Sequence, residues 1–198
     1  MKVICCLSRK GGVGKSLTAR SLAVAALFDN ERTAVLDADP QGSILSWVER
    51  REPPAPRVFP LEGTIAATLS AIRKGKPDYV FIDTPPSVHP VIDMAVQAAD
   101  LALIITGPYP EDLAAIGSSV QVVKSRKKRA VIILNRTPIR SSALHSHGVP
   151  WASSRCRFAR PQLFSASPIH MQPARAAQLR NGSPRATLRM KSRKFGNG

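Results

Sequence analysis

Acidic residues are missing from the second part of this chain. Of its 198 residues, 13 are Asp or Glu, and all 13 lie at or before Asp112, whereas residues 113–198 carry 17 Lys and Arg. The formal net charge of +16 is therefore concentrated toward the C-terminus. A bias of this kind is typical of proteins that bind nucleic acid or anionic lipid.

Cysteines, aromatics and long apolar runs are also scarce. Three cysteines, with Cys5 and Cys6 adjacent, exclude a disulfide framework and zinc-ligand spacing, so we expect these two to be small buried side chains. No apolar run approaches the roughly 20 residues of a membrane-spanning helix, and the first residues do not resemble a signal peptide. Aromatics make up 5% of the chain, too few to suggest a stacking platform for single strands. We therefore expect a cytoplasmic protein.

Apolar runs and helical spacing alternate along the first 140 residues. Short apolar runs predict strands over 3–7, 33–36, 79–82, 101–105 and 130–134. Apolar residues at helical spacing predict helices over 16–28, 44–49, 65–73, 91–99 and 111–123. The proline-rich stretch 52–60 predicts a loop with at most a short strand. This alternation indicates an α/β fold with a mostly parallel sheet and helices on both faces.

A glycine-rich loop, Lys-Gly-Gly-Val-Gly-Lys-Ser, lies between the first strand and the first helix, over residues 10–16. Backbone amides of such a loop surround phosphate oxygens, and the helix N-terminus adds its dipole. Lys15 would reach the β- and γ-phosphates, and the Ser16 hydroxyl would ligate Mg²⁺. Arg9 stands where the general P-loop pattern has glycine, so the loop is a variant with Lys10 at its entrance.

Three motifs together resemble the ParA/MinD family of P-loop ATPases with a deviant Walker A motif. The loop with Lys10 resembles that motif, the segment 37–42 (DADPQG) resembles switch I, and the segment 79–86 (YVFIDTPP) resembles the Walker B strand and switch II. The resemblance covers about residues 1–140. It is closest to the small plasmid ParA partition ATPases, because the N-terminus leaves no room for a helix-turn-helix domain before the loop. The segment 108–112 (PYPED) also resembles their sequences.

The resemblance implies a role for each motif residue. Lys10 would cross a dimer interface to the phosphates of the partner's nucleotide, Asp39 would position the attacking water, and Asp83 would lie near Mg²⁺, directly or through water. Lys10, Lys15 and Asp39 would then be catalytic, and Ser16 and Asp83 would hold the metal ion. The nucleotide-binding set would comprise Gly11, Gly12, Val13, Gly14, Lys15, Ser16, Leu17 and Asn135.

Each role has a simpler alternative. Asn135 resembles the adenine-reading Asn of the family, and it is equally a residue that forms turns. Lys10 could be a solvated surface side chain, Asp39 part of a common turn after a strand, and Asp83 a cap of the next helix.

The function implied is that of a Mg²⁺-dependent ATPase that segregates plasmid or chromosomal DNA. ATP would drive formation of a homodimer, and the dimer would bind DNA without sequence preference. A centromere-binding partition protein would stimulate hydrolysis and release the dimer. The protein would be a bacterial, nucleoid-associated, cytoplasmic protein without a membrane partner.

A basic run over residues 124–129 is a candidate DNA-binding patch. A solvated helix end, where cations suit the helix dipole, would explain it equally well. The candidate DNA-binding residues are Lys124, Arg126, Lys127, Lys128 and Arg129.

Residues 141–198 depart from the family and form a separate basic segment in our division of the chain. They show no strand or helix period, and family members continue with a further strand and acidic amphipathic helices. Translation of a GC-rich gene in a wrong frame would produce such a composition, and so would a genuine basic tail. Under either explanation we expect this segment to be largely disordered, without a stable strand or packed helix.

Three other functions would share some of these features. A MinD-like membrane-cycling ATPase would need a C-terminal amphipathic helix, for which the apolar residues near the C-terminus are too sparse. Metabolic P-loop enzymes, such as a dethiobiotin synthetase or a nitrogenase-type iron protein, would need other motifs or cluster cysteines. A non-enzymatic basic protein that binds nucleic acid would need no phosphate loop.

Overall fold

The computed structural model describes residues 1–86 and 90–136, and the backbone of residues 156–159. All of them belong to one compact unit, Met1–Ser165. The strands are β1 (Lys2–Leu7), β2 (Thr33–Asp37), β3 (Arg57–Pro60), β4 (Tyr79–Asp83), β5 (Leu101–Thr106), β6 (Ala130–Leu134) and β7 (Cys156–Ala159). The helices are α1 (Lys15–Phe28), α2 (Ser43–Val48), α3 (Ile65–Arg73), α4 (Pro90–Ala98) and α5 (Pro110–Ser125).

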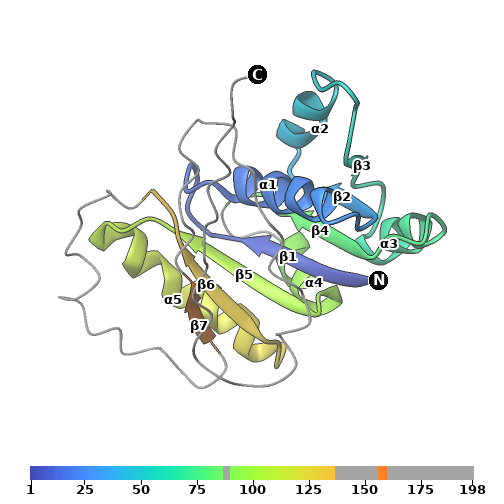
Figure 1. The fold of residues 1–198 in the computed structure, drawn as a ribbon. Coiled ribbons are helices and arrows are strands. Elements are labelled where there is room, and N and C mark those ends of the chain that lie inside the picture. Colours follow the sequence, from blue (N-terminus) through green and yellow to red (C-terminus); the bar gives the residue numbers. More distant parts are fainter. Residues whose placement is uncertain (87–89, 137–155, 160–198) are drawn as a thin grey trace, which may run out of the picture. The chain divides into compact units, whose positions relative to one another are not determined.

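The strands form one parallel sheet in the order β3-β2-β4-β1-β5-β6-β7 (Figure 1). The central strands β1, β2 and β4 are almost entirely apolar, as expected of strands covered on both faces. Side chains from one face pack against α3, α4 and α5, and those from the other face pack against α1 and α2. The predicted α/β fold with helices on both faces is confirmed.

Because the strands are parallel, their carboxyl ends all lie at one edge of the sheet. Asp37 at the end of β2 is in register with Asp83 at the end of β4, and Cys6 of β1 is in register with Asp83 on its other side. The phosphate loop follows β1 directly. The motifs predicted from the sequence therefore meet at one edge, where α/β sheets commonly bind ligands.

Local predictions agree closely with the described elements, with one clear error. Cys5 and Cys6 are fully buried, as expected. The expectation of no strand in residues 141–198 is wrong, because β7 pairs with β6 in parallel at the end of the sheet. A four-residue strand has too short a pattern to stand out, and its pairing depends on β6. The rest of the predicted tail lies outside the described residues.

Within the described part of the chain, no helix is both long and apolar enough to cross a membrane.

Candidate functional site

The phosphate loop depends on glycine at the point where it enters α1. Gly14 has φ +95°, a left-handed conformation that other residues adopt at a cost, and a Cβ there would collide with the side-chain amide of Asn135. The first turn of α1 is fixed to the loop, because the Thr18 hydroxyl donates to the Gly14 carbonyl at 2.8 Å. The loop backbone and the helix N-terminus thus form the anion-binding arrangement that the sequence predicts.

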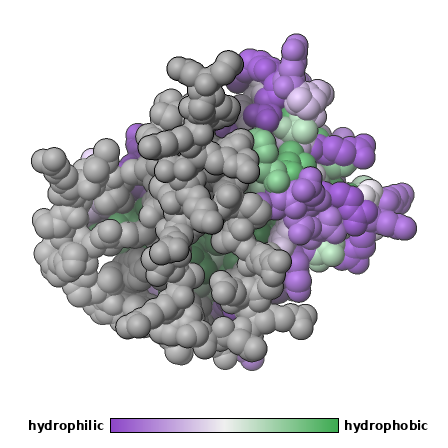
Figure 2. All heavy atoms as spheres, viewed as in Figure 1, coloured by the Kyte–Doolittle hydropathy of each residue, from purple (hydrophilic) through white to green (hydrophobic). Residues whose placement is uncertain are grey.

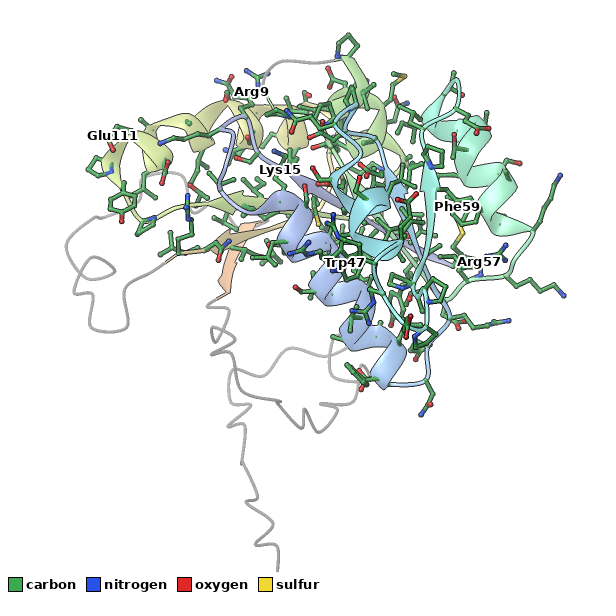
Figure 3. The ribbon with its side chains drawn as sticks, turned by 90° about the horizontal axis from the view of Figure 1, so that it is seen from above. Arg9, Lys15, Trp47, Arg57, Phe59 and Glu111 are labelled. Atoms are coloured by element: carbon green, nitrogen blue, oxygen red, sulfur yellow. The ribbon has the colours of Figure 1, made fainter. Side chains whose placement is uncertain are left out.

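Lys15 is the first residue of α1 and is only 6% exposed (Figure 3). Burial lowers the pKa of its ammonium group, and the carboxylates of Asp83 and Asp39 oppose that shift. The structure therefore brings together three of the predicted site residues: one lysine of the loop and two acids from the ends of neighbouring strands. A buried cation next to the loop amides is suited to bind phosphate oxygens.

Asp83 is fully buried at the end of β4, and within the described residues its carboxylate oxygens accept no hydrogen bond of good geometry, although the Ser16 hydroxyl lies close to them. Burial raises the pKa of Asp83 to about 7, while the Ser16 hydroxyl and Lys15 counteract that rise. An unpartnered buried carboxylate is costly unless a cation is bound nearby.

The surroundings of Asp83 fit Mg²⁺, which is commonly held by one or two carboxylates together with substrate phosphates and water. The described residues contain no cluster of three or more His, Cys, Asp and Glu that would hold a metal ion by itself. A metal ion here would therefore depend on Asp83, Ser16 and the nucleotide.

Asp37 and Asp39 make different contacts. Asp37 is buried and accepts hydrogen bonds from the backbone amides of Ile44 and Leu45, at 3.0 and 3.2 Å, so it fixes the start of α2. The carboxylate of Asp39 is half-buried and accepts a bond from the Gln41 amide at 3.0 Å. Asp39 is therefore the more accessible of the two acids, in keeping with the role predicted for it.

Lys10 forms an ion pair with Asp112, in the first turn of α5. The Lys10 side chain is 44% exposed and that of Asp112 is 7% exposed. The Asp112 carboxylate lies so close to Gly107 that a Cβ on Gly107 would collide with it. No role for Asp112 was predicted from the sequence, because it lies about 100 residues from Lys10 along the chain.

Asn135 and Arg136 contact the phosphate loop from the end of β6. The Nδ2 of Asn135 donates to the Val13 carbonyl at 2.9 Å, and Nη1 of Arg136 donates to the Gly12 carbonyl at 3.0 Å. Asn135 also accepts a bond from the Arg136 amide, as a turn residue does. Its predicted adenine-reading role stays a prediction, and the Arg136 contact was not anticipated from the sequence.

The remaining predicted residues divide between the two edges of the sheet. Leu17 is 49% exposed on the first turn of α1, close to the loop. The basic run 124–129 precedes β6 and therefore lies at the opposite edge. Two of its members already have partners, since Lys128 donates to the Ala99 carbonyl and Arg126 pairs with Asp93. Lys124, Lys127 and Arg129 are exposed.

A family model described as "CobQ/CobB/MinD/ParA nucleotide binding domain" matches residues 4–152. The chain belongs to this family. The match includes β1 with its phosphate loop and the ends of β2 and β4. The resemblance predicted from the three motifs is thereby confirmed.

Named relatives agree with this assignment. The chain is 39% identical over 142 residues to "Maintenance of carboxysome distribution protein A" of Gloeobacter kilaueensis, covering 69% of this chain and 64% of that relative. The chain thus spans less than two thirds of the relative's length.

Solved structures share the fold. The MinD cell division protein of Aquifex aeolicus is 26% identical, with a TM-score of 0.56 and 70% of each chain covered. A putative plasmid partition protein of Borrelia burgdorferi, bound to AMPPNP, is 19% identical and shares the fold with a TM-score of 0.61, over 79% of this chain and 83% of that one.

Proposed function

We propose that this chain is a Mg²⁺-dependent ATPase that binds DNA in its ATP-bound dimeric form and thereby segregates or positions a cargo on the bacterial nucleoid. The observation that supports this most strongly is the buried, unpartnered carboxylate of Asp83 beside Lys15 and the phosphate loop. A carboxylate in that position would hold the metal ion of a nucleotide bound at the loop.

The site residues have distinct parts in this proposal. The loop amides and Lys15 bind the β- and γ-phosphates, and Asp83 and Ser16 hold the metal ion, which would neutralise charge on the phosphates when bound. Asp39 orients the attacking water. It does not have to be a strong base, because phosphoryl transfer depends mainly on positioning and charge. Asn135, which donates to the Val13 carbonyl of the loop, would contact the nucleotide from there.

Lys10 is the residue through which ATP binding would favour dimerisation in this proposal. In the single chain it pairs with Asp112 and is still 44% exposed, so it is accessible to a second subunit. If Lys10 reaches the phosphates of the partner's nucleotide, the active site is complete only in the dimer. ATP binding would then favour dimerisation, and hydrolysis would reverse it.

Two cargoes are consistent with the comparisons. The motif resemblance favours plasmid or chromosomal DNA, brought by a centromere-binding partition protein. The 39% identity to a protein named for maintenance of carboxysome distribution favours a protein compartment as the cargo. Both would use the same ATP-dependent binding to DNA and differ in the partner that stimulates hydrolysis.

ATP turnover by the full chain, with and without duplex DNA of unrelated sequence, tests the proposal. We expect Mg²⁺-dependent turnover, and DNA binding with ATP that is lost with ADP. Asp39→Ala should still bind ATP and dimerise while hydrolysis stops. Equal DNA binding with ATP, with ADP and without nucleotide would favour a simple basic nucleic-acid-binding protein, and ATP-dependent binding to vesicles in place of DNA would favour a MinD-like function.

A further inference from the structure

The edge of the sheet opposite the phosphate loop collects basic side chains from segments far apart in the sequence. Because the strands are parallel, the residues that precede β1 to β6 lie together at this edge. Several of these segments carry exposed Lys or Arg. We call this surface the basic edge, and it consists of Lys2, Arg32, Arg57, Arg73, Lys74 and Lys76 together with the run 124–129.

Two acidic residues at the same edge, Asp78 and Asp100, are already engaged, whereas Asp29 and Glu31 between α1 and β2 add negative charges that the Lys and Arg outnumber. Asp78 accepts hydrogen bonds from the Arg32 amide, Nε and Nη2 at 2.9, 3.1 and 3.0 Å. Asp100 accepts a bond from the Val3 amide at 2.8 Å. Within the described residues no ion pair joins Arg73, Lys74 or Lys76 to a carboxylate, so their charges remain available.

A pocket of about 340 Å³ opens at this edge beside the start of β4. Met1, Arg32, Arg73, Lys76, Pro77 and Asp78 line it. A helix-dipole effect explains Arg73 in the last turn of α3. It does not explain Lys76, in the turn that follows α3, or Arg32, which directly precedes β2. Arg73 and Lys76, beside the Arg32–Asp78 ion pair, give this concave surface a net positive charge, which favours an anionic group such as a phosphate.

The length of the basic edge favours a polymer over a single phosphate. From β3 to β6 the sheet has five strand spacings of about 4.8 Å, which gives roughly 24 Å. Duplex DNA rises about 3.4 Å per base pair and carries one charge per about 1.7 Å, so this length matches about seven base pairs. Figure 2 shows hydrophilic residues gathered at the side where Figure 1 places α3 and the N-terminus.

We propose that the basic edge, with the Arg32–Arg73–Lys76 pocket at its centre, is a binding surface for the phosphate backbone of duplex DNA. This rests on the proposed DNA-binding function and extends the surface from the run 124–129 across β1 and β4 toward β3. Contacts to phosphates alone carry no sequence information, so binding here is independent of sequence and strongly dependent on salt.

Binding of the full chain with ATP to a labelled duplex of about 30 base pairs, measured at several salt concentrations, tests this surface. The test variant is Arg73→Gln/Lys74→Gln/Lys76→Gln. Lys74→Gln and Arg50→Gln form a matched pair, because each removes one exposed positive charge. Lys74 belongs to the basic edge, and Arg50 follows α2 and is not among the residues of the basic edge. Thermal unfolding of each variant checks its fold, and if the triple variant fails to fold, the matched pair decides the test.

We expect the triple variant to bind at least tenfold more weakly at about 0.1 M salt, for every duplex sequence. Each lost phosphate contact should reduce the slope of log K against log salt by about 0.9, so the triple variant should lose about 2–3 in slope. Lys74→Gln should lower both quantities, and Arg50→Gln should leave them unchanged.

Two results separate this inference from the proposed function. If the unmodified chain binds DNA with ATP and the triple variant has the same affinity and slope, the basic edge is not the DNA surface, although the function stands. If the unmodified chain does not bind duplex DNA with ATP, the proposed function fails. Binding of anionic phosphatidylglycerol vesicles that the triple variant loses, without binding of DNA, would overturn the inference in favour of a lipid surface.

Discussion

Lys10 and Asp112 form a charge pair at the entrance of the phosphate loop, and the two side chains differ in burial. The Asp112 side chain is 7% exposed, so removing Lys10 leaves a nearly buried carboxylate without its cation. An uncompensated buried charge is costly, whereas the partly exposed lysine limits what the pair contributes. We therefore expect Lys10→Met to lower the free energy of unfolding of the nucleotide-free chain by about 1 kcal/mol.

A double-mutant cycle in urea measures this pair directly. In an Asp112→Asn background, Lys10→Met should cost clearly less, because no charge is left unpaired. The amide of Asn keeps the shape of the side chain that lies against Gly107. Strictly additive losses would mean that the two side chains do not stabilise each other.

Arg32 and Asp78 join the starts of β2 and β4 and give the fold a testable dependence on pH. Hydrogen bonds from Arg32, together with its charge, lower the pKa of Asp78 from 3.8 to about 2. A carboxylate whose pKa is lower in the folded state stabilises that state above the unfolded pKa, and the effect is lost as the pH falls through the folded value.

We therefore expect Asp78→Asn to be less stable than the unmodified chain at pH 7, with the difference shrinking below about pH 4 and vanishing below about pH 2. Urea midpoints of both proteins across this range provide the measurement. A difference that stays constant with pH would show that the ionised carboxylate has no part in it.

Gly117 lies inside helix α5 and Gly107 lies before it, and the two glycines differ in the space around them. A Cβ on Gly117 would meet nothing within 4 Å, whereas a Cβ on Gly107, between β5 and α5, would collide with Asp112. Alanine is preferred over glycine in a helix by about 1 kcal/mol. Gly117→Ala should therefore raise the free energy of unfolding by about 0.5–1 kcal/mol.

Gly107→Ala is the matched comparison, and it should destabilise the chain by about 1–3 kcal/mol, because the crowded space cannot hold a methyl group. Chemical denaturation of both variants provides the comparison. Destabilisation by Gly117→Ala would mean that α5 packs against something at that position.

The helices and strands with strong local patterns could be predicted from the sequence. The helix predicted over 65–73 has those bounds in α3, capped at its start by the Thr64 hydroxyl, which accepts from the Ala67 amide. The order of the strands could not be read in this way, because pairing is between distant segments. The strand β7 was missed for the same reason: four residues take their conformation from pairing with β6.

In the candidate site, too, local motifs could be predicted from the sequence and contacts between distant segments could not. Lys15, Asp39 and Asp83 were predicted because each stands in a motif at the end of a strand, and the structure brings them together. The contacts of Lys10 with Asp112 and of Arg136 with the Gly12 carbonyl were missed, because each joins segments about 100 residues or more apart. A local sequence pattern indicates the chemistry of a side chain, but it does not identify the distant residue that the side chain contacts.

At the scale of the described chain, two charged regions lie at opposite edges of one sheet. The nucleotide edge has the phosphate loop and the acids at the ends of β2 and β4, and the other edge has the Lys and Arg that precede the strands. Helix α5 connects them, since Asp112 lies in its first turn and Lys124 in its last turn, and its 16 residues span about 24 Å. A change at Lys10 on nucleotide binding would thus act on a helix whose end lies in the basic edge.

Equilibrium binding of ATP to the full chain with Mg²⁺, compared between Lys15→Ala and Arg50→Gln, tests the central claim most directly. Lys15 is a buried cation at the loop, and a charge-assisted bond to a phosphate is worth about 1.5–3 kcal/mol. Lys15→Ala should therefore bind ATP at least tenfold more weakly than the unmodified chain, and Arg50→Gln should bind it equally well. Unchanged ATP affinity in Lys15→Ala would contradict the assignment of this loop as the nucleotide site.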